Sequence, residues 1–296
     1  MPAGYPRRVN GARSTGSDRQ GALTLDPVRF VKGHGTENDF VVIPPHEGPV
    51  DLTPDLVRAL CDRRRGIGAD GVLRVVVVGQ TEISDPDVHW FMDYVNADGS
   101  IAEMCGNGIR VFARFLVAEG LEPPGRLAIA TRAGVKKVDV PVDGDITVGM
   151  GVPERLVDAK VTVGDARYDA VGWSMGNPHL VVSGVADLDA LDLTVAPQVN
   201  PADAYPNGVN VEFVERLGAA HIRMRVHERG VGETRSCGTG VCAAAVASMG
   251  ATGERSSYDV DVPGGRLVVK WCDGGNVLLT GPAVLVATGE IDLPER

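Results

Sequence analysis

Two short motifs in the sequence combine a cysteine with glycines in an arrangement that suits thiol chemistry. Residues 105–108 are Cys-Gly-Asn-Gly and residues 237–240 are Cys-Gly-Thr-Gly, and each motif leads into an apolar run. A cysteine at the start of a helix meets the positive end of the helix dipole and free backbone N–H groups, which favour the thiolate. We therefore expect the pKa of Cys105 and of Cys237 to be lowered. The glycines leave the N–H groups open to a carboxylate.

Two such thiols on opposite sides of one carbon atom could invert its configuration. One thiolate would remove the proton, and the other thiol would deliver a proton to the opposite face. The open N–H groups would stabilise the negative charge that develops on a neighbouring carboxylate. The motifs therefore predict stereoinversion next to a carboxylate, and its geometry requires no cofactor.

The five cysteines also admit other interpretations. A zinc site needs closely spaced cysteine and histidine ligands, and the sequence has no such spacing, so we expect no metal. Cys61, Cys242 and Cys272 are interpreted as inert thiols. Two facing thiols can also oxidise to a disulfide, which we interpret as a hazard for this site. A thiol redox protein or a non-catalytic binding protein is an alternative from another functional class.

The elements that must position the two thiols are two buried helices in a strand-rich chain. Residues 106–119 place apolar side chains on one face and are followed by Gly120, which should end the helix. Residues 238–249 are apolar almost throughout and are followed by Gly250, so this helix should be buried on all sides. A third, short helix is predicted over residues 55–62, after Thr53 as its cap and Pro54.

Short valine-rich runs bounded by turn residues predict strands, many of them in hairpins. These strands are residues 40–43, 72–78, 127–130, 138–142, 146–150, 180–182, 209–214, 222–226, 258–262, 267–271, 277–279 and 284–287. We therefore expect an α/β fold of the α+β kind, in which a strongly curved, mostly antiparallel sheet wraps around a central helix once in each half.

The two halves of the chain resemble each other. Cys237 follows Cys105 by 132 residues, and the same offset aligns residues 94–99 with residues 226–231. A looser similarity relates residues 35–42 to residues 176–182. Such matched copies predict two related domains that face each other, with both cysteines in the cleft between them. We expect one domain at residues 28–149 plus 283–296 and the other at 150–282, after a disordered N-terminal extension of residues 1–27.

Composition limits the partners of the protein. Its 296 residues include 29 Lys and Arg but 39 Asp and Glu, a net charge of −10. Such a surface repels phosphate backbones, so we expect no nucleic-acid partner. No apolar run approaches the roughly 18 residues of a membrane helix, and we expect no membrane association. The cysteine content fits a reducing cytosol better than a disulfide scaffold, so we expect a cytoplasmic protein.

Six motifs together resemble the diaminopimelate epimerase family, and the likeness extends from Val28 to Ile291. The motifs are residues 34–40, 66–71, 96–100, 104–108, 175–179 and 228–240. The resemblance implies two pseudo-symmetric domains with the site between them, and a cytoplasmic homodimer. It also implies an enzyme without pyridoxal phosphate or metal that converts L,L- to meso-diaminopimelate in lysine and peptidoglycan precursor synthesis.

The resemblance assigns roles to individual residues. Cys105 corresponds to the proton donor and Cys237 to the proton acceptor in the L,L-to-meso direction. The substrate contacts that it implies are Asn38, Asn96, Gly106, Asn107, Asn177, Asn210, Glu228, Arg229, Gly238 and Thr239, while His179 and Glu228 would tune the two thiols. Many family members carry glutamine where this chain has Gly71, so that contact is lost or is replaced by a water molecule or a backbone group.

A proline or hydroxyproline racemase is the nearest alternative, because it would use two thiols on a similar fold. Arg229 can bind a distal carboxylate through two hydrogen bonds, and Glu228 can bind a distal ammonium. With Asn177 and Asn210, these residues would be left unpaired by a substrate with a single amino-acid group. The sequence therefore favours a substrate with a charged group at each end.

Overall fold

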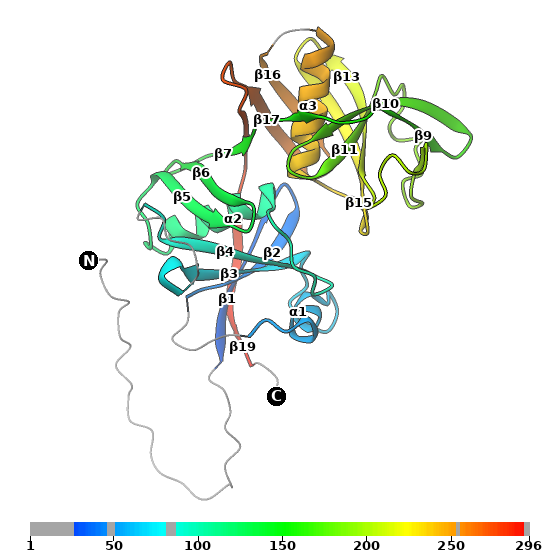
Figure 1. The fold of residues 1–296 in the computed structure, drawn as a ribbon. Coiled ribbons are helices and arrows are strands. Elements are labelled where there is room, and N and C mark those ends of the chain that lie inside the picture. Colours follow the sequence, from blue (N-terminus) through cyan, green and yellow to red (C-terminus); the bar gives the residue numbers. More distant parts are fainter. Residues whose placement is uncertain (1–26, 46–50, 81–86, 253–254, 293–296) are drawn as a thin grey trace, which may run out of the picture.

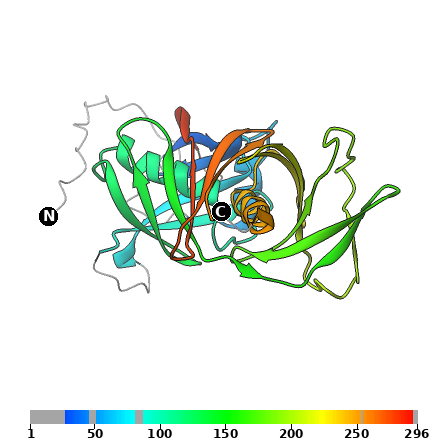
Figure 2. The same ribbon diagram turned by 90° about the horizontal axis from the view of Figure 1, so that it is seen from above.

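The computed structural model describes residues 27–45, 51–80, 87–252 and 255–292. It has two lobes side by side, each a curved sheet with one long helix against its inner face (Figures 1 and 2). The N-terminal extension expected over residues 1–27 lies outside the described residues, apart from Pro27. No helix in the described part of the chain is long and apolar enough to cross a membrane.

The first lobe contains the N-terminal strands and the last strand of the chain. Its elements are β1 (Val28–Gly35), β2 (Asn38–Ile43), α1 (Pro54–Cys61), β3 (Gly71–Val77), the 3₁₀ turn η1 (Val78–Gln80), β4 (Trp90–Asn96), α2 (Gly106–Ala118), β5 (Gly125–Thr131), β6 (Gly134–Val140), β7 (Ile146–Gly151) and β19 (Val284–Ile291). β19 returns to the first lobe by pairing antiparallel with β1.

The second lobe contains the intervening chain. Its elements are β8 (Glu154–Arg155), β9 (Ala159–Val163), β10 (Ala166–Ser174), β11 (Pro178–Ser183), β12 (Gln198–Asn200), β13 (Asn210–Gly218), β14 (His221–Glu228), β15 (Gly232–Thr234), α3 (Gly238–Thr252), β16 (Ser257–Val262), β17 (Gly265–Trp271) and β18 (Val277–Gly281). α3 packs inside this sheet, against strands that include β11, β13 and β17.

The strands of the two lobes pair in the same order. From β1 to β7, the successive pairs are antiparallel, parallel, antiparallel, parallel, antiparallel and antiparallel. The path β10, β11, β13, β14, β16, β17, β18 repeats this order. The sequence similarity between the halves is therefore a structural repeat, as predicted.

The two sheets are joined where β7 pairs antiparallel with β18. Thr147 and Thr280 face each other across this pair, with their hydroxyl oxygens 2.8 Å apart. Because the hydrogen-bonded ladder continues from one lobe to the other, it marks no sharp division between them. The domain boundaries expected at residues 149/150 and 282/283 stay a prediction.

Both long helices begin where the sequence predicts, directly after a cysteine. The backbone N–H of Ile109 donates to the Cys105 carbonyl, and that of Val241 to the Cys237 carbonyl, each at 2.9 Å. α2 ends before Gly120, which has the positive φ of 68° expected of a helix-ending glycine. The predicted end of α3 at Gly250 is wrong, because Gly250 keeps a right-handed conformation and the helix continues to Thr252.

Several strands have no counterpart in the prediction, among them β1, β4, β9 and β10. In β4, four consecutive residues are buried and one of them is charged, so the strand has neither an alternating nor an apolar pattern. That charge, Asp93, forms ion pairs with Arg74 and Arg132 from other segments. Local sequence patterns therefore do not predict this strand, because the partners of its buried charge lie far away along the chain.

The N-termini of α2 and α3 touch at a pair of glycines. A Cβ atom placed on Gly238 would lie 3.0 Å from the Cα of Gly106, and one placed on Gly106 would lie 3.3 Å from the Cα of Gly238. These distances leave no ordinary room for a side chain at the contact. The two helix starts can approach this closely only because both residues are glycine.

We expect Gly238→Ala to lower the free energy of unfolding by about 1–3 kcal/mol, because the added methyl group overpacks this contact. Urea denaturation measures the effect. Gly250→Ala is the matched control within the same helix, where the nearest atom to the new Cβ is Trp173 Cζ2 at 3.9 Å. That variant should gain about 0.5–1 kcal/mol from the better helix former. Equal stability of the two variants would contradict the packing argument.

Candidate active site

The two predicted catalytic thiols lie at the junction of the lobes, each directly before one of the touching glycines. Cys105 is half-buried, and its Sγ accepts a hydrogen bond from the backbone N–H of Gly108 at 3.3 Å. Cys237 is buried, and its Sγ lies 3.5 Å from the Thr239 hydroxyl oxygen. Neither thiol is in a disulfide. The structure thus brings Cys105, Cys237, Gly106 and Gly238 together, as the repeat predicted.

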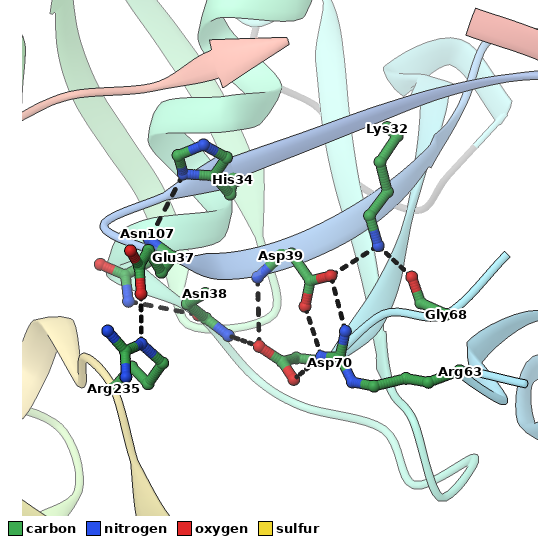
Figure 3. Close-up of polar contacts among 10 residues, drawn as sticks. All are labelled: Lys32, His34, Glu37, Asn38, Asp39, Arg63, Gly68, Asp70, Asn107 and Arg235. Carbon is green, nitrogen blue, oxygen red and sulfur yellow. Dashed lines mark hydrogen bonds and ion pairs between the residues drawn. The ribbon is translucent and has the colours of Figure 1, made fainter. Parts of the chain in front are cut away.

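Asn38 is held beside the Cys105 thiol in one orientation. Its Oδ1 accepts from Cys105 Sγ at 3.7 Å and from Asn107 Nδ2 at 3.2 Å, and its Nδ2 donates to Asp70 Oδ2 at 2.7 Å. Asp70 is held in turn by Arg63, whose guanidinium also pairs with Asp39 (Figure 3). Asp70 lies in a recognised motif, but sequence reasoning gave it no role. Its role here is to orient the Asn38 amide.

A cleft of about 630 Å³ borders this arrangement, and Figure 3 draws several of its lining residues. It is lined by Lys32, Gly33, His34, Glu37, Asn38, Asp39, Arg63 and Asp70 from the first lobe, by Val231 and Glu233–Ser236 from the second, and by Val286 of β19. The lining residues Asn38 and Ser236 also contact the residues around the thiols. The cleft therefore lies next to the junction of the lobes, although neither Cys105 nor Cys237 lines it.

Buried polar contacts close the junction between the lobes. Thr36 and Ser236 place their hydroxyl oxygens 2.8 Å apart, and Asn107 Nδ2 donates to the Ser236 carbonyl at 3.0 Å. Arg110 is fully buried and donates to the carbonyls of Gly106, at 3.1 Å, and Pro282, at 3.3 Å. Sequence reasoning missed Thr36, Ser236 and Arg110, because the contacts of Thr36 with Ser236 and of Arg110 with Pro282 join residues that lie far apart in the chain.

The predicted distal-group residues lie at the end of β14. The Glu228 carboxylate accepts from the Thr234 hydroxyl, and the backbone N–H of Arg229 donates to Asn210 Oδ1 at 3.0 Å. The exposed Arg229 guanidinium donates to the Asn207 carbonyl at 3.3 Å and has no carboxylate partner among the described residues. This cation is available to a ligand. In the first lobe, Asn96 Nδ2 donates to Ser100 Oγ at 3.0 Å.

His179 hydrogen-bonds to neighbours other than the thiols. Its Nδ1 lies 2.7 Å from Glu212 Oε1, and its Nε2 lies 3.0 Å from Asn177 Oδ1. His179 and Glu212 are both fully buried. A Cβ atom on Gly240 would lie 2.6 Å from Glu212 Oε1, so this carboxylate sits under the first turn of α3, next to Cys237. His179 therefore reaches the thiol region through Glu212, a residue that the sequence analysis did not select.

The repeat gives the two thiols different surroundings. Strand register matches Phe40 in β2 with His179 in β11, and Leu73 in β3 with Glu212 in β13. Phe40 and Leu73 pack under the first turn of α2, beside Gly108, in the place that His179 and Glu212 take near α3. An apolar pair thus supports the Cys105 helix, and a buried ionisable pair supports the Cys237 helix.

Both thiols have a raised pKa, contrary to the expectation from the helix dipole. Burial raises the pKa of Cys105 to about 11, although N–H groups at the start of α2 oppose the shift. Burial, with the charges of Glu228 and Glu212, raises the pKa of Cys237 well above its usual value. Removal of a thiolate from water therefore outweighs the stabilisation by the helix start. Both cysteines rest as thiols at neutral pH.

Glu228 is the carboxyl group best placed to change the protonation state of these thiols. Burial raises its pKa, while hydrogen bonds with Thr234 and Cys237 oppose that shift. A carboxyl group with a raised pKa in contact with a thiol is suited to proton exchange. Among the residues that the structure describes, no group of three His, Cys, Asp or Glu side chains could hold a metal ion.

The fold and the paired helix starts define a class of two-lobed proteins built from one repeated module. Solved structures with this fold include a probable proline racemase from Agrobacterium radiobacter K84, with 16% identity and a TM-score of 0.68 over 90% of this chain and 93% of that chain. A PhzF-family phenazine biosynthesis protein from Bacillus anthracis has 17% identity and a TM-score of 0.64 over 90% and 99%. At these identities the likeness concerns the fold alone.

Sequence comparison identifies the family. The family model described as diaminopimelate epimerase matches residues 30–156 and 172–286. The diaminopimelate epimerase of Streptomyces coelicolor is 53% identical over 279 residues, covering 90% of this chain and 96% of the relative. That of Rhodococcus jostii is 49% identical over 281 residues, covering 89% and 96%. The chain belongs to the diaminopimelate epimerase family.

Alkylation of Cys105 by iodoacetamide should accelerate with pH up to about pH 10.5 without levelling off, because only the thiolate reacts. With a pKa of about 11, the rate should rise about tenfold per pH unit over this range. Mass spectrometry of the alkylated peptide gives the rate, and circular dichroism at each pH checks that the protein stays folded. A plateau below pH 9 would contradict the raised pKa.

Glu212→Leu should destabilise the protein by about 3 kcal/mol, because it leaves His179 buried without its partner. The double variant His179→Phe, Glu212→Leu copies the apolar pair of the first lobe and should regain most of that loss. Urea denaturation of the two single variants and the double variant gives the coupling energy between the residues. Losses that simply add would show that the pair does not act as a unit.

Proposed function

We propose that this protein is a cofactor-independent isomerase that interconverts L,L- and meso-diaminopimelate for lysine and peptidoglycan precursor synthesis. The observation that carries the proposal is the pair of cysteines at two touching helix N-termini. Relatives about half identical over nearly their whole length are named diaminopimelate epimerase, which supports the same substrate.

In the proposed mechanism, the two thiols act on opposite faces of one Cα atom. In the L,L-to-meso direction, Cys237 removes the proton as thiolate and Cys105 delivers a proton from the other side. The helix starts at Gly106-Asn107 and Gly238-Thr239 bind the α-carboxylate and the negative charge that develops next to it. Because both thiols rest protonated, Cys237 must first be activated, and Glu228 is the proposed acceptor of its proton.

The distal end of the substrate is proposed to bind at the end of β14. The Arg229 guanidinium, without a carboxylate partner among the described residues, would bind the distal carboxylate. While it is still ionised, Glu228 would also attract the distal ammonium as the substrate binds, before it takes up the Cys237 proton. Asn38, Asn96, Asn177 and Asn210 would contribute neutral hydrogen bonds. Proline has no distal group for Arg229, so the racemase alternative is disfavoured even though such enzymes share the fold.

His179 is proposed to influence the thiols electrostatically, through Glu212, instead of by direct contact. We also propose a homodimer and a cytoplasmic location. β19 pairs with β1 on one edge and has no partner on its other edge among the described strands, and its Val284 and Val286 are exposed. An apolar strand edge of this kind suits association with a second copy. Light scattering of the purified protein tests the oligomeric state.

The reduced protein should incorporate deuterium at Cα of diaminopimelate in heavy water, because each proton removal exchanges the substrate hydrogen with solvent. Cys105→Ser and Cys237→Ser should each lower epimerisation by about 10³-fold or more, since an alcohol is a far weaker acid than a thiol. NMR follows the loss of the Cα proton signal. Cys272→Ser, outside the junction, is the control and should retain activity.

Absence of exchange in the reduced wild-type protein would overturn the proposed function. Parallel reactions with L-proline and trans-4-hydroxy-L-proline test the alternative substrate class. Exchange with these compounds but not with diaminopimelate would favour the racemase interpretation. Full activity of both serine variants would instead favour a binding or redox protein.

A further inference from the structure

Behind the thiols, the two lobes carry a polar side chain on different strands. In the second lobe, Asn210 of β13 pairs with His179 of β11. The corresponding residue in the first lobe is Gly71 of β3, which pairs with Phe40 of β2. One strand further on, Val226 of β14 corresponds to Tyr94 of β4. The second lobe thus has a polar side chain on β13, whereas the first lobe has one on β4.

Tyr94 explains why position 71 is glycine. A Cβ atom on Gly71 would lie 2.6 Å from Tyr94 Cε2 and 2.7 Å from the Val95 carbonyl oxygen. No side chain fits there without a shift of these neighbours, so the glutamine of other family members has no counterpart at position 71. The Tyr94 ring fills this space, with its hydroxyl oxygen 3.3 Å from the Cβ position.

The Tyr94 ring is firmly packed, whereas its hydroxyl oxygen is not fully buried. The residue is only 7% exposed, and its ring packs edge to face on Phe40 with centroids 5.8 Å apart. Phe40 itself lies under the first turn of α2, next to Gly108. Among the described residues, the Tyr94 hydroxyl has no hydrogen-bond partner, and its oxygen is not among the fully buried unpaired atoms, so it is open to a ligand.

The hydroxyl faces the site and not the outer side of the sheet. Side chains alternate along a strand, so Tyr94 and Asn96 share one face of β4, while Val95 packs with the α1 side. Burial raises the pKa of Tyr94 well above its usual value, and Glu228, Asp70 and, once it is ionised, Cys105 raise it further. The phenol is therefore neutral at neutral pH and lies close to groups from both lobes.

We propose that the Tyr94 hydroxyl is a further substrate-binding group, which hydrogen-bonds bound diaminopimelate beside Cys105 and serves in the first lobe as Asn210 does in the second. This inference rests on the proposed function. The substrate supplies the missing partner of the hydroxyl, and the rigid packing on Phe40 holds the group ready. Glycine at position 71 is then required for the tyrosine to reach the site.

Tyr94→Phe tests the proposal, because it removes the oxygen and keeps the ring. We expect KM for diaminopimelate to rise and kcat/KM to fall about tenfold or more, the loss typical of one hydrogen bond to substrate. The unfolding midpoint should stay the same or rise, since the removed hydroxyl has no protein partner among the described residues. A kcat/KM within twofold of wild type would overturn the inference.

Tyr168→Phe is a matched control. Tyr168 also packs edge to face on a phenylalanine, Phe213, with centroids 6.0 Å apart, but it lies in the outer part of the second lobe. This variant should keep wild-type kinetics, and a loss equal to that of Tyr94→Phe would overturn a specific role for Tyr94. Wild-type protein that shows no Cα exchange would overturn the proposed function and the inference together, whereas active Tyr94→Phe overturns the inference alone.

Discussion

The contact between Gly106 and Gly238 is the constraint on which the rest of the structure depends. Each glycine begins a helix that is packed inside its own sheet, so the contact also sets how the two sheets lie relative to each other. The cysteines that precede these glycines are thereby brought to one place. The backbone N–H groups of both helix starts converge there, which is the arrangement that a carboxylate between two thiols requires.

Burial makes the site selective. It also raises the pKa of the thiols, so the site is inactive until a thiol loses its proton. A thiol with a pKa of about 11 is ionised to the extent of only about one part in 10⁴ at pH 7. The helix starts do not overcome the loss of water, so an additional group must supply charge or accept a proton. The second lobe concentrates such groups around Cys237. Glu212 and His179 take the places of Leu73 and Phe40 in the first lobe, and Glu228 takes the place of Asn96.

The features that depend on residue type and local spacing were predictable from the sequence. The two Cys-Gly-x-Gly motifs located both helix starts and the repeat, because a cysteine flanked by glycines before an apolar run can be recognised from a few residues. The His179–Glu212 pair was not predictable, since it joins residues 33 positions apart through the parallel register of β11 and β13. Tyr94 was missed for a similar reason: its relation to Gly71 exists only across the β3–β4 ladder. The pKa of the thiols depended on burial, which a dipole argument leaves out.

The pairing of β7 with β18 has a consequence for the origin of the chain. Corresponding strands of the two lobes meet antiparallel, and corresponding helix starts meet at the same junction. A single lobe could present these same surfaces to an identical copy in a symmetric dimer, with the two-fold axis passing between the glycines. Such a dimer would surround both thiols identically. When the two copies are joined in one gene, the neighbours of one cysteine can differ from those of the other. Each cysteine can then perform a different step on one of the two faces of the substrate.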